Sequence, residues 1–155
     1  MKSLETLELA AGRRILALDV GKRRIGVAAS DGLGITAQGL ETIERRNQRE
    51  DFAAISRLAA DRGVDLVLIG YPIHMNGTEG GQAEWVREFA EALHTRCGLA
   101  VKLWDERLTS VEAGRVLRNS GISIEKRARA VDRLSAVILL QSYLDSLALA
   151  AEPGE

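Results

Sequence analysis

The 155-residue sequence predicts an α/β domain with a mixed β-sheet and helices on both faces. Two observations lead to this prediction. Strand patterns of the antiparallel kind come first, and a short turn rich in basic residues joins two of them. Helical and strand patterns then alternate, which is typical of strands covered by helices. Ligands bind such sheets where strands end and loops begin, so the strand ends are the first places to look for a site.

The predicted strands have two kinds of pattern. Ile15–Asp19 and Arg24–Ser30 pair as a hairpin through the turn "VGKRR", and a weaker third strand follows at about 36–43. The runs "VDLVLIG" and "AVKLW" are short and almost wholly apolar, as parallel strands buried on both faces are. We therefore expect three antiparallel strands followed by alternating helix and strand units.

Apolar residues at helical spacing predict four helices. Glycines close the first two, and a capping box formed by Thr109 and Glu112 opens the third. The helices are expected from about Phe52 to Gly63, from about Val86 to Gly98, from Thr109 to about Asn119, and from about Val131 to Leu149.

Composition restricts the class of protein. Hydrophobic residues make up 46% of the chain, yet no uninterrupted apolar run reaches the roughly 18 residues of a membrane span, and residues 1–14 lack the apolar core of a signal peptide. We therefore expect a soluble protein of the cytoplasm that has no membrane partner. A single cysteine, Cys97, excludes an internal disulfide and a cysteine-based metal cage.

Charge gives a local signal. The formal net charge is −1, so the chain as a whole has no attraction for nucleic acid. Basic residues nevertheless gather in three places, "KRR" at Lys22–Arg24, "RRNQR" at Arg45–Arg49 and "KRAR" at Lys126–Arg129. Any binding to nucleic acid must come from such clusters.

Acidic residues at three places lie next to apolar segments. Asp19 ends the first predicted strand, the pair Asp105 and Glu106 follows the last strand, and Asp132 lies one turn into the most apolar helix. Each place also has an ordinary explanation. Asp19 could form a turn, and Asp105 and Glu106 could start a helix and pair with Arg107. Asp132 could interact with the helix dipole. An unpaired carboxylate among core side chains costs several kcal/mol, so Asp19 needs a cation or strong donors.

Convergence of these acids would create a metal site. Carboxylates that approach one another repel, and the repulsion raises their pKa values unless a cation neutralises them. Mg²⁺ or Mn²⁺ suits that need, because hard divalent ions prefer oxygen ligands. The pattern favours a divalent-cation site at the strand ends and leaves the ordinary explanations open.

Four segments resemble the motif blocks of one family, in order and with similar spacing. They are "LALDVGKRRIGVAASD", "LIGYP" followed by "NGTEG", "DERLTSVEAGRVL" and "VDRLSAVILLQSYLD". Together they resemble the YqgF family, whose members have a ribonuclease H-like fold, are similar to RuvC-type Holliday junction resolvases and are described as nucleases that process the 5′ end of the 16S ribosomal RNA precursor. The resemblance implies a nuclease domain at 14–149, with an N-terminal extension at 1–13 and a tail at 150–155.

The resemblance also implies catalytic roles for the acids. Asp19 is similar to the aspartate of the first strand, Glu106 with Asp105 to the acid of the "DER" block, and Asp132 to the aspartate of the final helix. A site of this kind uses two metal ions, Mg²⁺ or Mn²⁺, which Asp19 would bridge while Glu106 and Asp132 hold one each. Asp105 would bind a metal directly or support its ligands. The "RLS" that follows Asp132 departs from the smaller residues of many relatives.

Basic residues beside these acids are expected to meet the phosphates of nucleic acid. Lys22, Arg23 and Arg24 follow Asp19 in the predicted hairpin, and a solvated turn is their ordinary explanation. Arg107 would clamp a phosphate or support the metal ligands.

Other functions stay open at this point. The substrate would be ribosomal RNA precursor or structured DNA, as for a Holliday junction resolvase, and the protein would be a monomer or a dimer. The first motif block also resembles the phosphate motif of actin-like nucleotide-binding proteins, but that architecture needs two domains and this chain has room for one. A non-catalytic RNA-binding module is a further alternative. The acids are present here, which favours catalysis.

Overall fold

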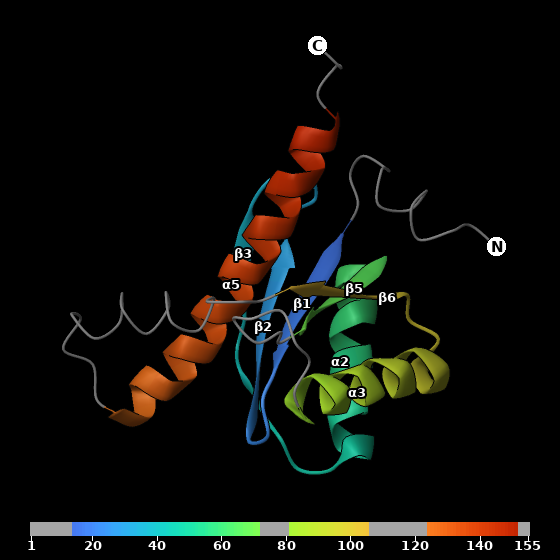
Figure 1. The fold of residues 1–155 in the computed structure, drawn as a ribbon, viewed down its shortest axis with the longest axis vertical. Helices are drawn as coiled ribbons and strands as arrows, with labels where there is room; N and C mark the ends of the chain where they lie inside the picture. The colour runs from blue at the N-terminus through green and yellow to red at the C-terminus, as the bar shows by residue number, and fades with distance from the viewer. Residues whose placement is uncertain (1–13, 72–80, 106–123, 152–155) are drawn as a thin grey trace.

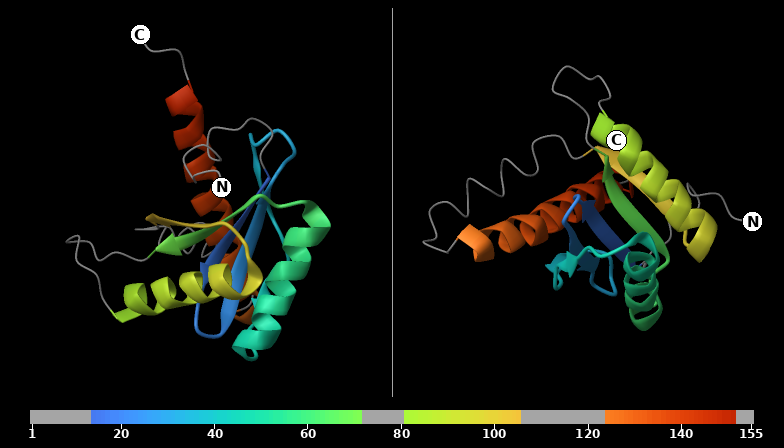
Figure 2. Two further views of the ribbon diagram at one scale, coloured as in Figure 1. Left: turned by 90° about the vertical axis from the view of Figure 1, so that its right-hand side faces the viewer. Right: turned by 90° about the horizontal axis from the view of Figure 1, so that it is seen from below.

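A central sheet with helices on both faces forms the described part of the chain, which in this computed structural model is residues 14–71, 81–105 and 124–151 (Figures 1 and 2). The strand order is β3-β2-β1-β5-β6, and β4 also pairs with β2. Helix α5 covers one face, and α2 and α3 cover the other. The elements are β1 (Ile15–Val20), β2 (Arg24–Ser30), β3 (Ala37–Gly39), β4 (Ile43–Glu44), α2 (Gln48–Arg62), β5 (Leu66–Tyr71), α3 (Gly81–Cys97), β6 (Val101–Asp105) and α5 (Ile124–Ala151).

The sheet is mixed, as predicted. β1 and β2 are antiparallel neighbours, whereas β1, β5 and β6 run parallel to one another. The two apolar runs of the sequence thus form the two parallel strands beside β1. Because parallel strands end on the same side, Val20, Tyr71 and Asp105 finish at one edge of the sheet. This edge carries the predicted acids of the first and last strands.

The strand predicted at 36–43 is instead two short strands separated by a bulge. β3 and β4 pair with β2 in registers that differ by one residue. Leu40 still follows the register of β3, because it donates its N–H to Val27 O (2.8 Å), so the extra residue lies between Leu40 and β4. The Leu40 carbonyl accepts from Arg133 Nε (3.0 Å). Arg133 belongs to α5, 93 residues further along the chain, so the local pattern held no sign of this interruption.

Alternate residues of β1 pack into opposite layers. Leu16, Leu18 and Val20 join the apolar cluster with α2 and α3. Ile15 and Ala17 join the cluster with α5. The sheet is therefore buried on both faces, and a polar side chain on β1 must lie at the strand's end to reach a ligand.

The predictions for α2 and α3 are confirmed, with starts earlier than their apolar patterns. Asn47 caps α2 by accepting from the N–H of Glu50 (2.9 Å), and Gly63 ends the helix in the left-handed conformation (φ 63°). Gly98 follows α3 with φ 69°. The helix predicted from Thr109 to Asn119 lies outside the described residues.

Helix α5 corrects the prediction for the last helix, which was expected from Val131 to Leu149. It begins at Ile124, because the polar segment 125–130 consists of good helix formers that carry no apolar stripe. Asp132 therefore lies beyond the first two turns of the helix. A helix dipole acts within the first turn, so it does not explain this acid. Although α5 runs for 28 residues, neither it nor another helix of the described segments is apolar over a length that could cross a membrane.

Candidate functional site

Asp19 occupies the end of β1 that the sequence predicted. The other residues of β1 are buried and Asp19 is partly exposed. Side chains alternate along a strand, so Asp19 continues the series of Ile15 and Ala17, which pack against α5. The carboxylate thus lies at the carboxyl end of the sheet on the side of α5. An acid is tolerated here beside core residues because Asp19, unlike its neighbours in β1, is partly exposed.

Gly26 brings Asp132 to the same place. Gly26 is the cross-strand partner of Asp19, and paired residues present their side chains on one face. A Cβ atom on Gly26 would lie 1.9 Å from the backbone carbonyl oxygen of Asp132, so α5 crosses β2 here in direct backbone contact. The missing side chain of Gly26 therefore sets Asp132 beside Asp19. Sequence reasoning missed Gly26, although a glycine inside a strand signals a close approach of backbone.

Arg24 pairs with Asp132. Its Nε lies 2.7 Å from Asp132 Oδ2, and the two side chains are 28% and 23% exposed. The hydrogen bond to Asp132 raises the pKa of Arg24 above its usual value, against the opposing effect of burial, and the charge of Glu44 adds to the rise. The sequence predicted that Arg24 meets phosphates of nucleic acid. In the structure its guanidinium instead contacts Asp132, an acid of the candidate site. It holds the Asp132 side chain toward β2.

Asp105 ends β6 on the same edge of the sheet as Asp19. It is exposed, and it is the register partner of Tyr71 at the end of β5. Side chains alternate along β6, so Asp105 lies on the same face as Val101 and Leu103, which pack against the apolar cluster with α2 and α3. Asp105 therefore belongs to the face of the sheet opposite to α5.

The turn between β1 and β2 presents Lys22 and Arg23 to solvent. The N–H of Gly21 donates to Arg24 O (2.9 Å), which closes the turn. Arg45 fixes it from outside: its backbone N–H donates to Arg23 O (2.9 Å) and its Nη1 to Gly21 O (3.1 Å). The backbone of the turn is thus tied down while its two basic side chains remain exposed.

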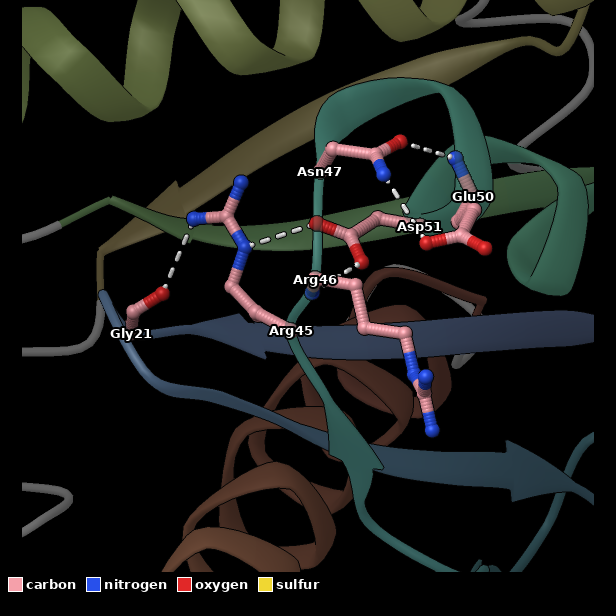
Figure 3. A network of polar contacts seen from close by, with 6 residues as sticks. All are labelled: Gly21, Arg45, Arg46, Asn47, Glu50 and Asp51. Atoms are coloured by element: carbon pink, nitrogen blue, oxygen red, sulfur yellow. Dashed lines mark hydrogen bonds and ion pairs between the residues drawn. The ribbon is translucent and has the colours of Figure 1, made fainter.

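Arg45 is the centre of a buried network (Figure 3). Its Nε lies 3.0 Å from Asp51 Oδ2, and these side chains are 14% and 2% exposed. The guanidinium carbon lies 5.2 Å from the ring centroids of both Trp85 and Phe89. This arginine therefore joins the hairpin turn to α2 and α3, a role that a reading of "RRNQR" as one basic cluster could not identify.

The donor atoms of the site suit a hard divalent cation. Asp19 and Asp132 supply carboxylate oxygens, and Mg²⁺ and Mn²⁺ prefer such ligands. In the part of the chain that the structure describes, no group of three or more His, Cys, Asp or Glu side chains is arranged to hold a metal ion. The third predicted acid, Glu106, and its neighbour Arg107 lie outside the described residues. The described residues thus bring together two of the three predicted acids.

The strand order, with one long helix across β1 and β2, defines the class of the protein as ribonuclease H-like. The structure of T. thermophilus RuvC in complex with a Holliday junction substrate shares this fold, with a TM-score of 0.54 and 11% sequence identity. The alignment covers 88% of this chain and 96% of that chain. At this identity the likeness shows the fold alone. It confirms the predicted fold class.

The chain belongs to the RuvX family, which is described as Holliday junction resolvase, and the family model matches residues 13–146. Two relatives carry the name "Putative pre-16S rRNA nuclease". The relative from Koribacter versatilis (strain Ellin345) is 52% identical over 132 residues, which are 85% of this chain and 86% of the relative. The relative from Moorella thermoacetica is 51% identical over 134 residues, or 86% and 96% of the two chains. This confirms the family that the four motif blocks resemble, and with it the enzyme class of nuclease.

Proposed function

We propose that this protein is a divalent-metal-dependent endonuclease that hydrolyses phosphodiester bonds in the precursor of 16S ribosomal RNA, near its 5′ end. The observation that carries the proposal is the backbone contact of Asp132 in α5 with Gly26, which is the cross-strand partner of Asp19. Two carboxylates at the carboxyl edge of a ribonuclease H-like sheet suit metal-assisted hydrolysis. The names of the relatives support ribosomal RNA precursor as the substrate.

Asp19 and Asp132, with Glu106, would hold the metal ions. Bound Mg²⁺ or Mn²⁺ would supply an activated water and stabilise negative charge on the phosphate. Asp19 would hold metal from the end of β1, where its cross-strand partner Gly26 contacts α5. Asp105 acts as a support and not as a direct ligand, since alternation sets it on the opposite face of the sheet.

The basic residues divide into two groups in this proposal. Lys22 and Arg23 contact phosphates, because they are exposed on a rigid turn next to Asp19. Arg24 is a positioning residue, since its guanidinium holds Asp132. Arg107 would clamp a phosphate, because it directly follows Glu106 in the sequence. Replacing Lys22 and Arg23 together should weaken binding and flatten its dependence on salt.

A structured-DNA substrate is the second candidate, and the description of the RuvX family as Holliday junction resolvase favours it. The two candidates share the same acids and differ in the nucleic acid that enters the site. Cleavage of a labelled 16S precursor fragment and of a four-way DNA junction, compared on one protein preparation with Mn²⁺, separates them. Faster cleavage of the junction would contradict the proposed RNA substrate.

The catalytic assignment is tested with Asp19→Asn, Glu106→Gln and Asp132→Asn. Each variant should lose at least about 100-fold of its Mn²⁺-dependent cleavage, because residues that act as one unit give losses that are not additive. Without metal, Asp19→Asn and Glu106→Gln should melt near the wild type, since removal of one crowded carboxylate relieves repulsion. Asp132→Asn also loses its ion pair with Arg24, so it should melt somewhat lower and still lose its cleavage. Asp61→Asn, an exposed acid near the end of α2, is the matched control and should keep full activity. If the variants melt well below the wild type yet still cleave, the three acids stabilise the fold and are not catalytic, which would contradict the assignment.

A further inference from the structure

The basic segment 45–49 separates into one structural arginine and two free ones. Arg45 is buried against Asp51, Trp85 and Phe89, so its charge is already neutralised. Arg46 and Arg49 are exposed, and within the described residues neither forms an ion pair. Figure 3 shows the Arg46 side chain extending away from the network around Arg45. Two uncompensated positive charges therefore remain on this side of the molecule.

Arg49 faces a second arginine across a cleft between α2 and α3. The cleft has a volume of about 260 Å³, and its walls carry Arg49, Arg96 and the hydroxyl of Ser56. The remaining lining residues, Phe52, Ala53 and Cys97, are uncharged, so no acid lines the cleft. Arg96 Nη1 donates to Gln48 Oε1 (2.8 Å), which orients this guanidinium without neutralising it. The cleft thus offers an anion two guanidinium groups, of which Gln48 orients that of Arg96, and the side chain of Ser56.

The cleft is attached to the catalytic edge through Arg45. The backbone N–H of Arg45 bonds Arg23 O, and its side chain bonds Gly21 O. The segment that leads to Arg49 is therefore anchored on the turn that presents Lys22 and Arg23. Along the chain, the exposed Arg46 and Arg49 follow this anchor. A nucleic-acid strand bound at the turn could therefore continue over this segment to the cleft.

We propose that Arg49 and Arg96 form a phosphodiester-binding subsite, which holds the nucleic-acid backbone at a distance from the cleaved bond. Guanidinium groups bind phosphate oxygens through paired hydrogen bonds, and Ser56 can donate another. The buried floor at Phe52 offers no surface on which a base could stack. The subsite therefore reads the backbone and not the sequence. It rests on the proposed function only in assuming that the partner is a nucleic acid.

The experiment compares Arg49→Gln/Arg96→Gln with the wild type and with Arg57→Gln/Arg62→Gln. The control removes the same charge from exposed positions of α2 outside the cleft. Binding of labelled single-stranded RNA and DNA of two lengths is measured by fluorescence anisotropy without metal, over a range of salt concentrations. Each lost phosphate contact reduces the slope of log K against log salt by about 0.7 for a single strand.

We expect the cleft variant to bind the longer strand about fivefold to tenfold more weakly, with a slope smaller by about 1.4. Strands too short to reach from the turn to the cleft should bind equally well to the cleft variant and the wild type. Equal loss on RNA and DNA is expected from a backbone contact, whereas a loss on RNA alone would assign the subsite to RNA. Affinity and slope equal to those of the control would overturn the proposal.

Cleavage assays distinguish this proposal from the proposed function. If the wild type binds with the expected slope but cleaves neither RNA nor DNA with Mn²⁺, the proposed function fails and the subsite stands. If the wild type cleaves and the cleft variant has an unchanged slope, the subsite fails and the proposed function stands. Equal melting temperatures of the two double variants and the wild type ensure that binding is compared between folded proteins.

Discussion

Arg24 of β2 and Asp132 of α5, 108 residues apart in the sequence, form an ion pair with 2.7 Å between Nε and Oδ2. The pair lies beside Gly26, where the backbone of α5 touches β2. Arg24 is thus the cation that neutralises Asp132, which we propose as a metal ligand. If a metal ion takes over this role, the change has measurable consequences.

Arg24→Gln should destabilise the metal-free protein by about 1 to 3 kcal/mol, because it leaves the partly buried Asp132 without its countercharge. Mn²⁺ should then raise the melting temperature of the variant more than that of the wild type, since the metal ion takes over the neutralisation of Asp132. Thermal melts with and without millimolar Mn²⁺ measure both effects. The double variant Arg24→Gln/Asp132→Asn is the control and should lose the extra shift. Equal Mn²⁺ shifts in all three proteins would show that Asp132 binds no metal.

Gly26→Ala should destabilise the protein by more than about 3 kcal/mol and reduce Mn²⁺-dependent cleavage in parallel. A Cβ atom would sit 1.9 Å from backbone oxygen of α5, so the helix must move. Gly39→Ala is the matched control on the neighbouring strand. Its Cβ would meet side-chain carbons of Arg133 at 2.7 Å, and a side chain can shift without movement of the helix backbone, so this variant should lose less stability. Urea denaturation compares the two, and similar losses would contradict the close contact at Gly26.

Asp51→Asn should cost about 3 kcal/mol of unfolding free energy. Asp51 is 2% exposed, and its loss leaves the Arg45 guanidinium without a carboxylate partner inside the protein. Glu50→Gln, next to it in the first turn of α2, changes the same charge at an exposed position and should cost less than about 1 kcal/mol. Chemical denaturation checks the difference. Similar values for both variants would mean that the network of Figure 3 does not hold the hairpin turn to the helices.

Asp31 predicts part of the acid sensitivity of the fold. Its carboxylate accepts the backbone N–H of Ile35 (2.8 Å), and this bond holds the pKa of Asp31 below its usual value. A lowered pKa in the folded state means that the stabilisation is complete above the unfolded pKa, about 4, and is lost as the pH falls through the folded pKa. The stability difference between wild type and Asp31→Asn should therefore be constant from about pH 7 to 5 and shrink below about pH 4. Urea midpoints across that range test it, and a difference that does not vary with pH would contradict it.

The sequence was sufficient for those parts of the fold that depend on local burial. Apolar alternation and apolar runs located β1, β2, β5 and β6, and Gly63 located the end of α2, whereas its start at Gln48 was not predicted. Asp19 was singled out because a carboxylate interrupts an apolar strand, and Asp132 because it lies in an otherwise apolar helix. The division into a domain at 14–149 with flanking segments, the cytoplasmic location and the catalytic roles of Asp19, Glu106 and Asp132 stay predictions.

Only the tertiary structure decided which charged residues that are far apart in the sequence form ion pairs. It paired Arg24 with Asp132, buried Arg45 against Asp51, and left Arg46 exposed. It also split the third strand into β3 and β4, which pair with β2 in different registers, and brought Arg133 of α5 to Leu40 between them. The physical reason is that periodicity records which face of an element is buried, whereas an ion pair or a backbone contact depends on which element lies against that face. Four arginines near the turn have the same charge in the sequence, and only the elements packed around each one determine which are partnered and which can meet a ligand.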